Sequence, residues 1–261
     1  MISRFDAVIF DWAGTTVDYG CFAPVAAFQE TFREFGMDPT MDETRAPMGM
    51  LKWDHIKTML AGERLSDQWT AAHAGSSPTD ADVDAMYAVY EPKLLSILDH
   101  YADPKPGVLD AVASLREQGL RIGSTTGFTD SMMAIVAPKA AERGYAPDCW
   151  ITPDSTDGFG RPYPYMVFAN MRALRLPDVR RVAKVGDTIS DVREGKAAGC
   201  FTIAVTEGSS QMGFGESEFE ALSPADRQSA RDAARDAFLA AGADAVIDTM
   251  AELPVLLSQL G

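Results

Sequence analysis

Acidic residues follow two of the predicted buried strands, in an arrangement that suits phosphoryl chemistry. Asp11 ends the apolar run of residues 7–10, and Asp187 follows the run of residues 181–185, with Asp191 four positions on. One such aspartate alone is more often the N-cap of a helix. Several carboxylates at one sheet edge repel one another unless a cation neutralises them, and hard oxygen ligands favour Mg²⁺. A carboxylate here can also act as a nucleophile and form an aspartyl phosphate.

Two further segments supply groups that suit phosphate oxygens. Thr126 and Gly127 follow a predicted strand and offer a hydroxyl and a closely approachable backbone N–H at a helix entrance. Arg161 precedes a helix that begins with proline, where its guanidinium can neutralise a phosphoryl oxygen. Alone, the Thr126-Gly127 segment is equally well an ordinary turn, and an arginine such as Arg161 is more often a surface residue. Their occurrence together with Asp11 and Asp187 at successive strand ends favours one site.

A lysine and a histidine stand on one face of a predicted helix that begins near Met48. Spacings of four and three place Met48, Lys52 and His55 on one stripe, which Met59 continues. Partial desolvation on this stripe would lower the pKa of the lysine towards neutrality, and the histidine could move protons. The pattern alone favours a solvated lysine and a core histidine.

The elements that must position these residues alternate between strands and helices. Strands are predicted at residues 7–10, 120–124, 149–152, 181–185, 201–205 and 245–247, and helices at 24–35, 107–118, 129–143, 162–174, 190–198, 224–241 and 250–260. This alternation predicts an α/β fold with a doubly wound parallel sheet. In such sheets the site lies at the carboxyl ends of the strands.

Residues 38–101 show only helical periodicity, in pieces near 48–61, 64–73 and 79–99, with Thr79 as an N-cap and Pro92 kinking or dividing the last piece. We therefore expect a core of residues 1–20 and 103–261 with an all-helical insert, residues 21–102, after the first strand. The insert leaves the sheet just beyond Asp11, where it can act as a lid. Residues 207–215 are predicted to form one mobile loop.

Composition limits the class of protein. The 261 residues are 46% hydrophobic, enough for a real core, and carry a formal net charge of −15, which disfavours nucleic-acid binding. Cys21, Cys149 and Cys200 are too few and scattered for a disulfide framework. The sequence has no apolar run long enough to span a membrane, and its first residues do not form a signal segment. We expect a cytoplasmic protein.

The order of these motifs resembles that of the haloacid dehalogenase (HAD) superfamily of phosphotransferases. Asp11 matches its nucleophile motif, Thr126 its Thr/Ser, Arg161 its Lys/Arg, and the pair Asp187 and Asp191 its acidic motif. The helical insert matches its small cap. One position departs, because Ala13 stands in DWAGTT where the superfamily has a second aspartate. Loss of that acid–base group would cost a monoesterase on the order of 10²–10⁴ in rate.

The departure points to one family. The segments DWAGTTVDYGCFAP, PMGMLKWDHI, GSTTGFT and GRPYPYM closely resemble the phosphonoacetaldehyde hydrolase (phosphonatase) family. The resemblance implies Mg²⁺-dependent cleavage of phosphonoacetaldehyde to acetaldehyde and phosphate, a Schiff base on a cap lysine, and a homodimer formed through the cap. A carbon leaving group has no bridging oxygen to protonate, so an imine must accept its electrons, which explains an alanine at 13 together with a lysine at 52.

The resemblance assigns roles residue by residue. Asp11 is the nucleophile and Lys52 the imine-forming lysine; Asp11, the Ala13 carbonyl and Asp187 bind Mg²⁺; Thr126, Gly127 and Arg161 hold the phosphoryl oxygens; Asp191, His55, Met48 and Cys21 orient a water, move protons or line the pocket. Phe128 stands where some members have tyrosine. Two other functions are open: another HAD phosphatase or phosphomutase, which Ala13 disfavours, and a non-catalytic phosphometabolite-binding module.

Overall fold

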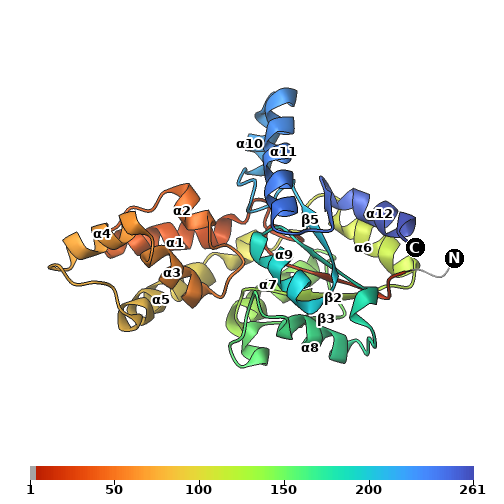
Figure 1. The fold of residues 1–261 in the computed structure, drawn as a ribbon, viewed down its shortest axis with the longest axis horizontal. Coiled ribbons are helices and arrows are strands. Elements are labelled where there is room, and N and C mark those ends of the chain that lie inside the picture. The colour runs from red at the N-terminus through yellow and green to blue at the C-terminus, as the bar shows by residue number, and fades with distance from the viewer. Residues whose placement is uncertain (1–3) are drawn as a thin grey trace.

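A six-stranded parallel sheet forms the centre of the larger part of the molecule (Figure 1). The computed structural model describes residues 4–261, so residues 1–3 of the predicted core lie outside it. The strand order is β3-β2-β1-β4-β5-β6. The strands are β1 Ala7–Phe10, β2 Arg121–Thr125, β3 Cys149–Ile151, β4 Val182–Gly186, β5 Phe201–Val205 and β6 Ala245–Ile247. The predicted doubly wound parallel sheet is therefore confirmed.

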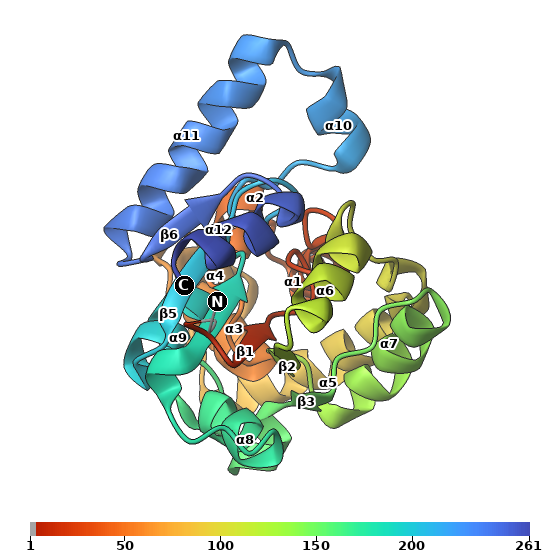
Figure 2. The same ribbon diagram turned by 90° about the vertical axis from the view of Figure 1, so that its right-hand side faces the viewer.

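Both faces of the sheet are covered, which explains why the central strand β1 is apolar throughout. Successive side chains of β1 alternate between the two sides: Val8 and Phe10 belong to one core cluster, and Ala7 and Ile9 to another. The helices of the first side are α6 Val108–Glu117, α7 Asp130–Glu142 and α12 Leu253–Gln259. Those of the second side are α8 Tyr165–Ala173, α9 Ile189–Ala198 and α11 Pro224–Ala240 (Figure 2).

The segment between β1 and α6 is helical and lies to one side of the sheet (Figure 1). It comprises α1 Phe22–Glu34, α2 Met41–Arg45, α3 Lys52–Leu60, α4 Glu63–Ala72, α5 Asp80–Leu95 and a 3₁₀ turn, η1 Leu98–Tyr101. Phe28 of α1 stacks on Tyr90 of α5, with the ring centroids 4.3 Å apart. The predicted N-cap at Thr79 is present, since its backbone N–H donates to the Asp82 carboxylate at 2.8 Å.

The two chain segments that join this insert to the sheet pair with each other. Val17, in the outgoing segment, forms an antiparallel bridge with Pro104 in the returning one. The N–H of Lys105 donates to the Thr16 carbonyl at 2.9 Å. Both connections therefore leave the sheet side by side, directly after the loop that follows β1.

Several predicted boundaries were wrong. The helix predicted to begin near Met48 begins at Lys52, because Pro47 and Gly49 (φ +84°) interrupt helical backbone there. Helix α5 continues through Pro92 without being divided, and it ends at Leu95. The predicted end at residue 99 was therefore too late.

Other differences concern short elements and one loop. Helix α8 begins at Tyr165, three residues after the cis-linked Pro162. Two short helices, α2 and α10 Glu216–Ala221, were not predicted. The loop of residues 207–215 packs against the site, with Ser209 and Ser210 buried. Within residues 4–261, no helix is both long and apolar enough to cross a membrane.

Candidate active site

Three buried aspartates meet where the strand order of the sheet reverses. Asp11 follows β1, Asp187 follows the adjacent strand β4, and Asp191 lies in the first turn of α9. One carboxylate oxygen from each lies within 4.8 Å of the others. The predicted meeting of these groups is confirmed. Ligands bind in such sheets at this position, outside the carboxyl ends of the strands at the switch point.

The surroundings of Asp187 fit a cation. Burial, together with the charges of Asp11 and Asp191, raises its pKa well above the usual value. The Thr15 hydroxyl donates to one of its oxygens at 2.8 Å, and the Ser210 N–H donates to the other at 2.7 Å. These two donors orient the Asp187 carboxylate, but they do not neutralise the charge of the three aspartates. An oxygen-only cluster of this kind suits Mg²⁺.

Arg161 lies directly beside the predicted nucleophile. One of its Nη atoms is 2.5 Å from an oxygen of Asp11 and 3.1 Å from the Thr125 carbonyl, and the side chain is almost completely buried. Its other Nη atom lies 3.4 Å from the carbonyl of Gly49, in the insert. The neighbouring carboxylates of Asp11, Asp191 and Glu194 hold the guanidinium's pKa well above its usual value against the opposing effect of burial. This cation therefore stays charged next to any anion that reaches Asp11.

Asp191 helps to cap α9 from the third position of the helix, whereas the N-cap itself is Thr188. Its N–H donates to the Thr188 hydroxyl, and its carboxylate accepts the Thr188 N–H at 3.2 Å, in a capping box at the start of α9. It also accepts a bond from Lys184 Nζ at 2.8 Å, and the positive charges of Arg161 and Lys184 lower its pKa despite burial. Asp191 is thus more firmly held by protein groups than Asp187.

Thr126 and Gly127 lie at the junction between the sheet and the insert. The Thr126 hydroxyl accepts the N–H of Phe128 at 3.1 Å, which fixes the turn after β2. A Cβ atom placed on Gly127 would lie only 2.8 Å from the carbonyl oxygen of Met50 and 3.1 Å from that of Gly49. Glycine at this position is therefore what allows the insert to approach the loop after β2.

Lys52 begins α3 and lies in an apolar, aromatic setting. Its side chain is buried, with Nζ 5.3 Å from the ring centroid of Phe128 and 5.9 Å from that of Phe28. Burial lowers the pKa of the amine, an effect that the charge of Asp11 opposes. The expected desolvation of this lysine is therefore present, and the side chain is not the solvated lysine that pattern alone favours.

His55 lies one turn along α3 and is completely buried. One ring nitrogen, Nε2, lies 2.8 Å from the Thr44 carbonyl oxygen, and the ring stacks on Phe28 at 3.9 Å. Burial and the nearby Lys52 charge lower its pKa well below the usual value, so the ring is neutral. Because a carbonyl only accepts hydrogen bonds, Nε2 carries the proton. Nδ1 is then a bare acceptor, and it has no hydrogen-bond partner within residues 4–261.

An apolar wall stands where the superfamily carries its second aspartate. Cys21, Val25 and Met48 form a buried cluster against which Ala13 packs. Met48 lies before α3 rather than on its face, as the corrected helix start requires, and its carbonyl accepts the hydroxyl of Ser190 at 3.0 Å. Burial raises the pKa of the Cys21 thiol well above its usual value, so the thiol is neutral. The second aspartate is thus replaced by a hydrophobic surface shared between the sheet and the insert.

Sequence reasoning missed several residues that complete this site. They are Thr15, Lys105, Lys184, Glu194 and Ser210. A lysine within the otherwise apolar strand β4 was a readable signal for Lys184, since an unpaired charge is not stable in such a position. The backbone donor at Ser210 had no sequence signal, because any residue except proline supplies an N–H.

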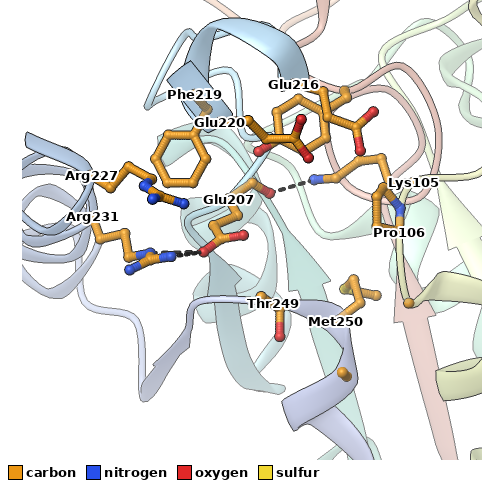
Figure 3. A pocket seen from close by; sticks show the side chains of 13 residues that line it. Lys105, Pro106, Glu207, Glu216, Phe219, Glu220, Arg227, Arg231, Thr249 and Met250 are labelled. Atoms are coloured by element: carbon orange, nitrogen blue, oxygen red, sulfur yellow. Dashed lines mark hydrogen bonds and ion pairs between the residues drawn. The ribbon is translucent and has the colours of Figure 1, made fainter. Parts of the chain in front are cut away.

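Lys105, in the returning connection of the insert, contacts the loop after β1 and the loop after β5. Its buried Nζ donates to the carbonyl of Gly14. It also donates, at 2.8 Å, to the carbonyl of Glu207 (Figure 3). Burial lowers the pKa of this amine to about 8. The cavity behind it, of about 380 Å³, is lined by Tyr19 and by residues of α10 and α11, and none of the predicted site residues lines it. The aspartate cluster and Lys52 are instead buried.

Comparison with known proteins places this geometry in a family. The model of the haloacid dehalogenase-like hydrolases matches residues 5–199, and a related HAD-hydrolase-like model matches residues 158–253. Phosphonoacetaldehyde hydrolases from Lysinibacillus sphaericus (strain C3-41) and Bacillus anthracis are 46% and 44% identical over 257 residues, 98% of this chain and 95% and 97% of theirs.

Two further proteins show how widely the likeness extends. A bifunctional phosphonoacetaldehyde hydrolase/aminoethylphosphonate transaminase from Clostridioides difficile (strain 630) is 46% identical, and the match spans 40% of its length. The crystal structure of a phosphonoacetaldehyde hydrolase-like protein from Oleispira antarctica superposes with a TM-score of 0.94 at 33% identity, covering 99% of this chain and 93% of that one. The chain therefore belongs to the phosphonoacetaldehyde hydrolase family of the haloacid dehalogenase-like hydrolases.

Proposed function

We propose that this chain hydrolyses the carbon–phosphorus bond of phosphonoacetaldehyde, giving acetaldehyde and phosphate. The observation that carries the proposal is the burial of both Lys52, in the insert, and Asp11, after β1, together with an alanine at position 13. A carboxylate nucleophile and a desolvated amine suit a substrate with a phosphonyl group at one end and a carbonyl at the other. A phosphate monoester would use the first group and have no need of the second.

Lys52 supplies the electron sink that a carbon leaving group requires. Its amine, whose pKa burial lowers, adds to the aldehyde carbon, and loss of water gives a protonated imine on Nζ. When the carbon–phosphorus bond breaks, its electron pair passes into the imine, and the organic fragment leaves as an enamine on Lys52. Protonation of the enamine carbon and hydrolysis of the imine then release acetaldehyde and restore the amine.

Asp11 receives the phosphoryl group. Its carboxylate oxygen attacks phosphorus as the carbon departs, which forms an aspartyl phosphate that water hydrolyses to phosphate. Arg161, already 2.5 Å from that carboxylate, holds the phosphoryl oxygens together with the Thr126 hydroxyl and the Gly127 N–H. The apolar wall around Ala13 donates no proton, in keeping with a leaving carbon that needs none on oxygen.

Mg²⁺ is the metal that the site fits, held by Asp11, the Ala13 carbonyl and Asp187. When bound, it supplies positive charge that lessens repulsion between the carboxylates and an anionic substrate. The Thr15 hydroxyl and the Ser210 N–H keep the Asp187 carboxylate in position for this role. Asp191 holds the start of α9 and is expected to contribute less to metal affinity.

In the proposed mechanism, His55 transfers protons during imine formation. Its neutral ring presents a bare Nδ1, while the Thr44 carbonyl fixes the proton on Nε2. A neutral imidazole can accept the proton that the Lys52 amine loses on adding to the aldehyde, and can return a proton as water departs.

Three features of organisation belong to the same proposal. The core comprises residues 1–20 and 103–261 and the cap residues 21–102, which is supported by the pairing of Val17 with Pro104 at the two connections. The cap mediates a homodimer, as the family resemblance implies. Three free cysteines are in keeping with a cytoplasmic location.

The direct test is product analysis. Purified protein with MgCl₂ and phosphonoacetaldehyde should release acetaldehyde and inorganic phosphate in equal amounts, whereas p-nitrophenyl phosphate should be turned over far more slowly. Faster turnover of the ester would favour an ordinary phosphatase of the same superfamily. Binding of phosphate with no turnover of either compound would favour a non-catalytic module.

A further inference from the structure

A fully buried carboxylate that the proposed mechanism does not use lies behind Arg161. Glu194 is on α9, three residues after Asp191, and its side chain is inaccessible to solvent. One oxygen, Oε2, accepts bonds from Nε of Arg161 at 3.1 Å and from the Thr125 hydroxyl at 2.9 Å. The other oxygen, Oε1, has no hydrogen-bond partner among the described residues.

The hydrogen bonds of Arg161 give the two sides of its guanidinium different partners. Nε faces Glu194, at the back of the site. The two Nη atoms face Asp11 and the carbonyl of Gly49, where the insert closes. Because a guanidinium is planar, fixing Nε and one Nη atom fixes the direction of the whole group.

We infer that Glu194 is a positioning residue that orients Arg161 so that its Nη atoms present themselves to the phosphoryl group. The inference rests on the proposed function, in which Arg161 binds phosphoryl oxygens. When an anion enters, the Nη atoms turn part of their bonding from Asp11 to the ligand. The bond from Nε to Glu194 remains, so the arginine is prevented from following Asp11 or rotating away.

The competing explanation is that Glu194 only neutralises the buried lysine of β4. Lys184 Nζ lies 3.4 Å from Glu194, but 2.8 Å from Asp191, which already accepts its hydrogen bond. The shorter contact of Glu194 is with Arg161, at 3.1 Å. Asp191 contacts both cations, since it also lies 3.1 Å from an Nη atom of Arg161. Glu194, in contrast, lies closer to Arg161 than to Lys184 and accepts its hydrogen bond from Arg161.

Three variants separate these explanations. Glu194→Met removes both the charge and the acceptor, Glu194→Gln keeps an acceptor for Nε, and Glu194→Met with Lys184→Met removes one charge of each sign. Glu117→Met, at an exposed position on α6, is the control. For each protein we would measure the melting temperature, the dissociation constant for inorganic phosphate with MgCl₂ by calorimetry, and kcat and KM with phosphonoacetaldehyde.

We expect Glu194→Met to weaken phosphate binding at least tenfold and to lower kcat/KM about 100-fold. Glu194→Gln should stay within threefold of the unmodified protein in phosphate affinity. The double variant should regain melting temperature but not phosphate affinity. Recovery of phosphate affinity in the double variant, or equal damage in the Gln and Met variants, would overturn the inference.

The phosphate measurement also separates failure of this inference from failure of the proposed function. If the unmodified protein binds phosphate but does not turn over phosphonoacetaldehyde, the proposed function is wrong while the phosphate results still decide the role of Glu194. Should Glu194→Met not fold, the Gln and double variants decide it.

Discussion

A single methyl group at position 127 should hold the insert away from the sheet. In Gly127→Ala the new Cβ would lie 2.8 Å from the Met50 carbonyl oxygen and 3.1 Å from that of Gly49. Ordinary contacts of this kind begin at 3.4 Å, so the shortfall is about 0.6 Å. Both obstructing atoms belong to the backbone and cannot turn aside. Because Gly127 does not have a positive φ, the substitution does not strain its own backbone.

The displacement acts on catalysis through Lys52, which lies two residues after Met50. Misplacing a reacting group by about 1 Å can cost on the order of 10²-fold in rate. For a shift of about half that size we expect kcat/KM for phosphonoacetaldehyde to fall about tenfold, or roughly 1.4 kcal/mol in transition-state free energy. The melting temperature should change little, because the residue lies at a surface between two packed units rather than within either core.

Gly215→Ala is the matched control, since a Cβ there would meet no atom closer than 3.6 Å and φ is −71°. Steady-state kinetics of the two variants beside the unmodified protein give the comparison. Full activity in Gly127→Ala would refute the argument that close approach of the insert at this point positions Lys52. An equal loss in Gly215→Ala would also refute it.

Four further outcomes follow from the site. Ala13→Asp should lower turnover of phosphonoacetaldehyde several-fold and raise any activity on p-nitrophenyl phosphate, because it adds a second negative charge beside Asp11; kcat/KM for both substrates checks this. EDTA should abolish turnover and MgCl₂ restore it, and calorimetry should show that Asp187→Asn weakens Mg²⁺ binding more than Asp191→Asn. Burial raises the pKa of Asp18 to about 7; the folded protein keeps this proton where the unfolded chain loses it, so stability relative to Asp18→Asn should decrease by up to about 4 kcal/mol between pH 4 and 7 in urea unfolding. Lys105→Met should leave the buried Gly14 carbonyl and the partly buried Glu207 carbonyl without their donor and lower the free energy of unfolding by about 2–4 kcal/mol, measured in the same way.

The sheet and the meeting of Asp11 with Asp187 could be predicted because they depend on local patterns. Short apolar runs that alternate with helices predict parallel strands, and the carboxyl ends of parallel strands share one edge. The strand order then brings two residues that are distant in the sequence into one cluster. No detail of side-chain packing enters that inference.

The start of the helix that carries Lys52 could not be predicted as securely. Periodicity extends a helix back to Met48, whereas Pro47 and the left-handed Gly49 stop it at Lys52. A Cβ on Gly49 would lie 2.4 Å from the Thr188 hydroxyl. The conformation of Gly49 therefore depends on its contact with the start of α9, which is distant in the sequence. Tertiary contacts of this kind leave no mark in local periodicity.

The role of Glu194 and the tautomer of His55 could not be predicted from the sequence. Glu194 occurs in a helix whose pattern allows it to be a solvated residue, and only the fold places it against Arg161. His55 was recognised as a candidate, yet its tautomer depends on the Thr44 carbonyl of an unpredicted helix. Such roles depend on which groups face each other across separate elements.

The most direct measurement of the central claim is chemical trapping of the imine on Lys52. Sodium borohydride added during turnover should inactivate the enzyme and fix a two-carbon fragment, which peptide mass spectrometry locates. We predict that the modification is on Lys52 and that Lys52→Arg, which keeps the charge but cannot form an imine, is neither labelled nor active. Labelling of Lys57 or Lys93 with Lys52 unmodified, or full turnover by Lys52→Arg, would contradict the account.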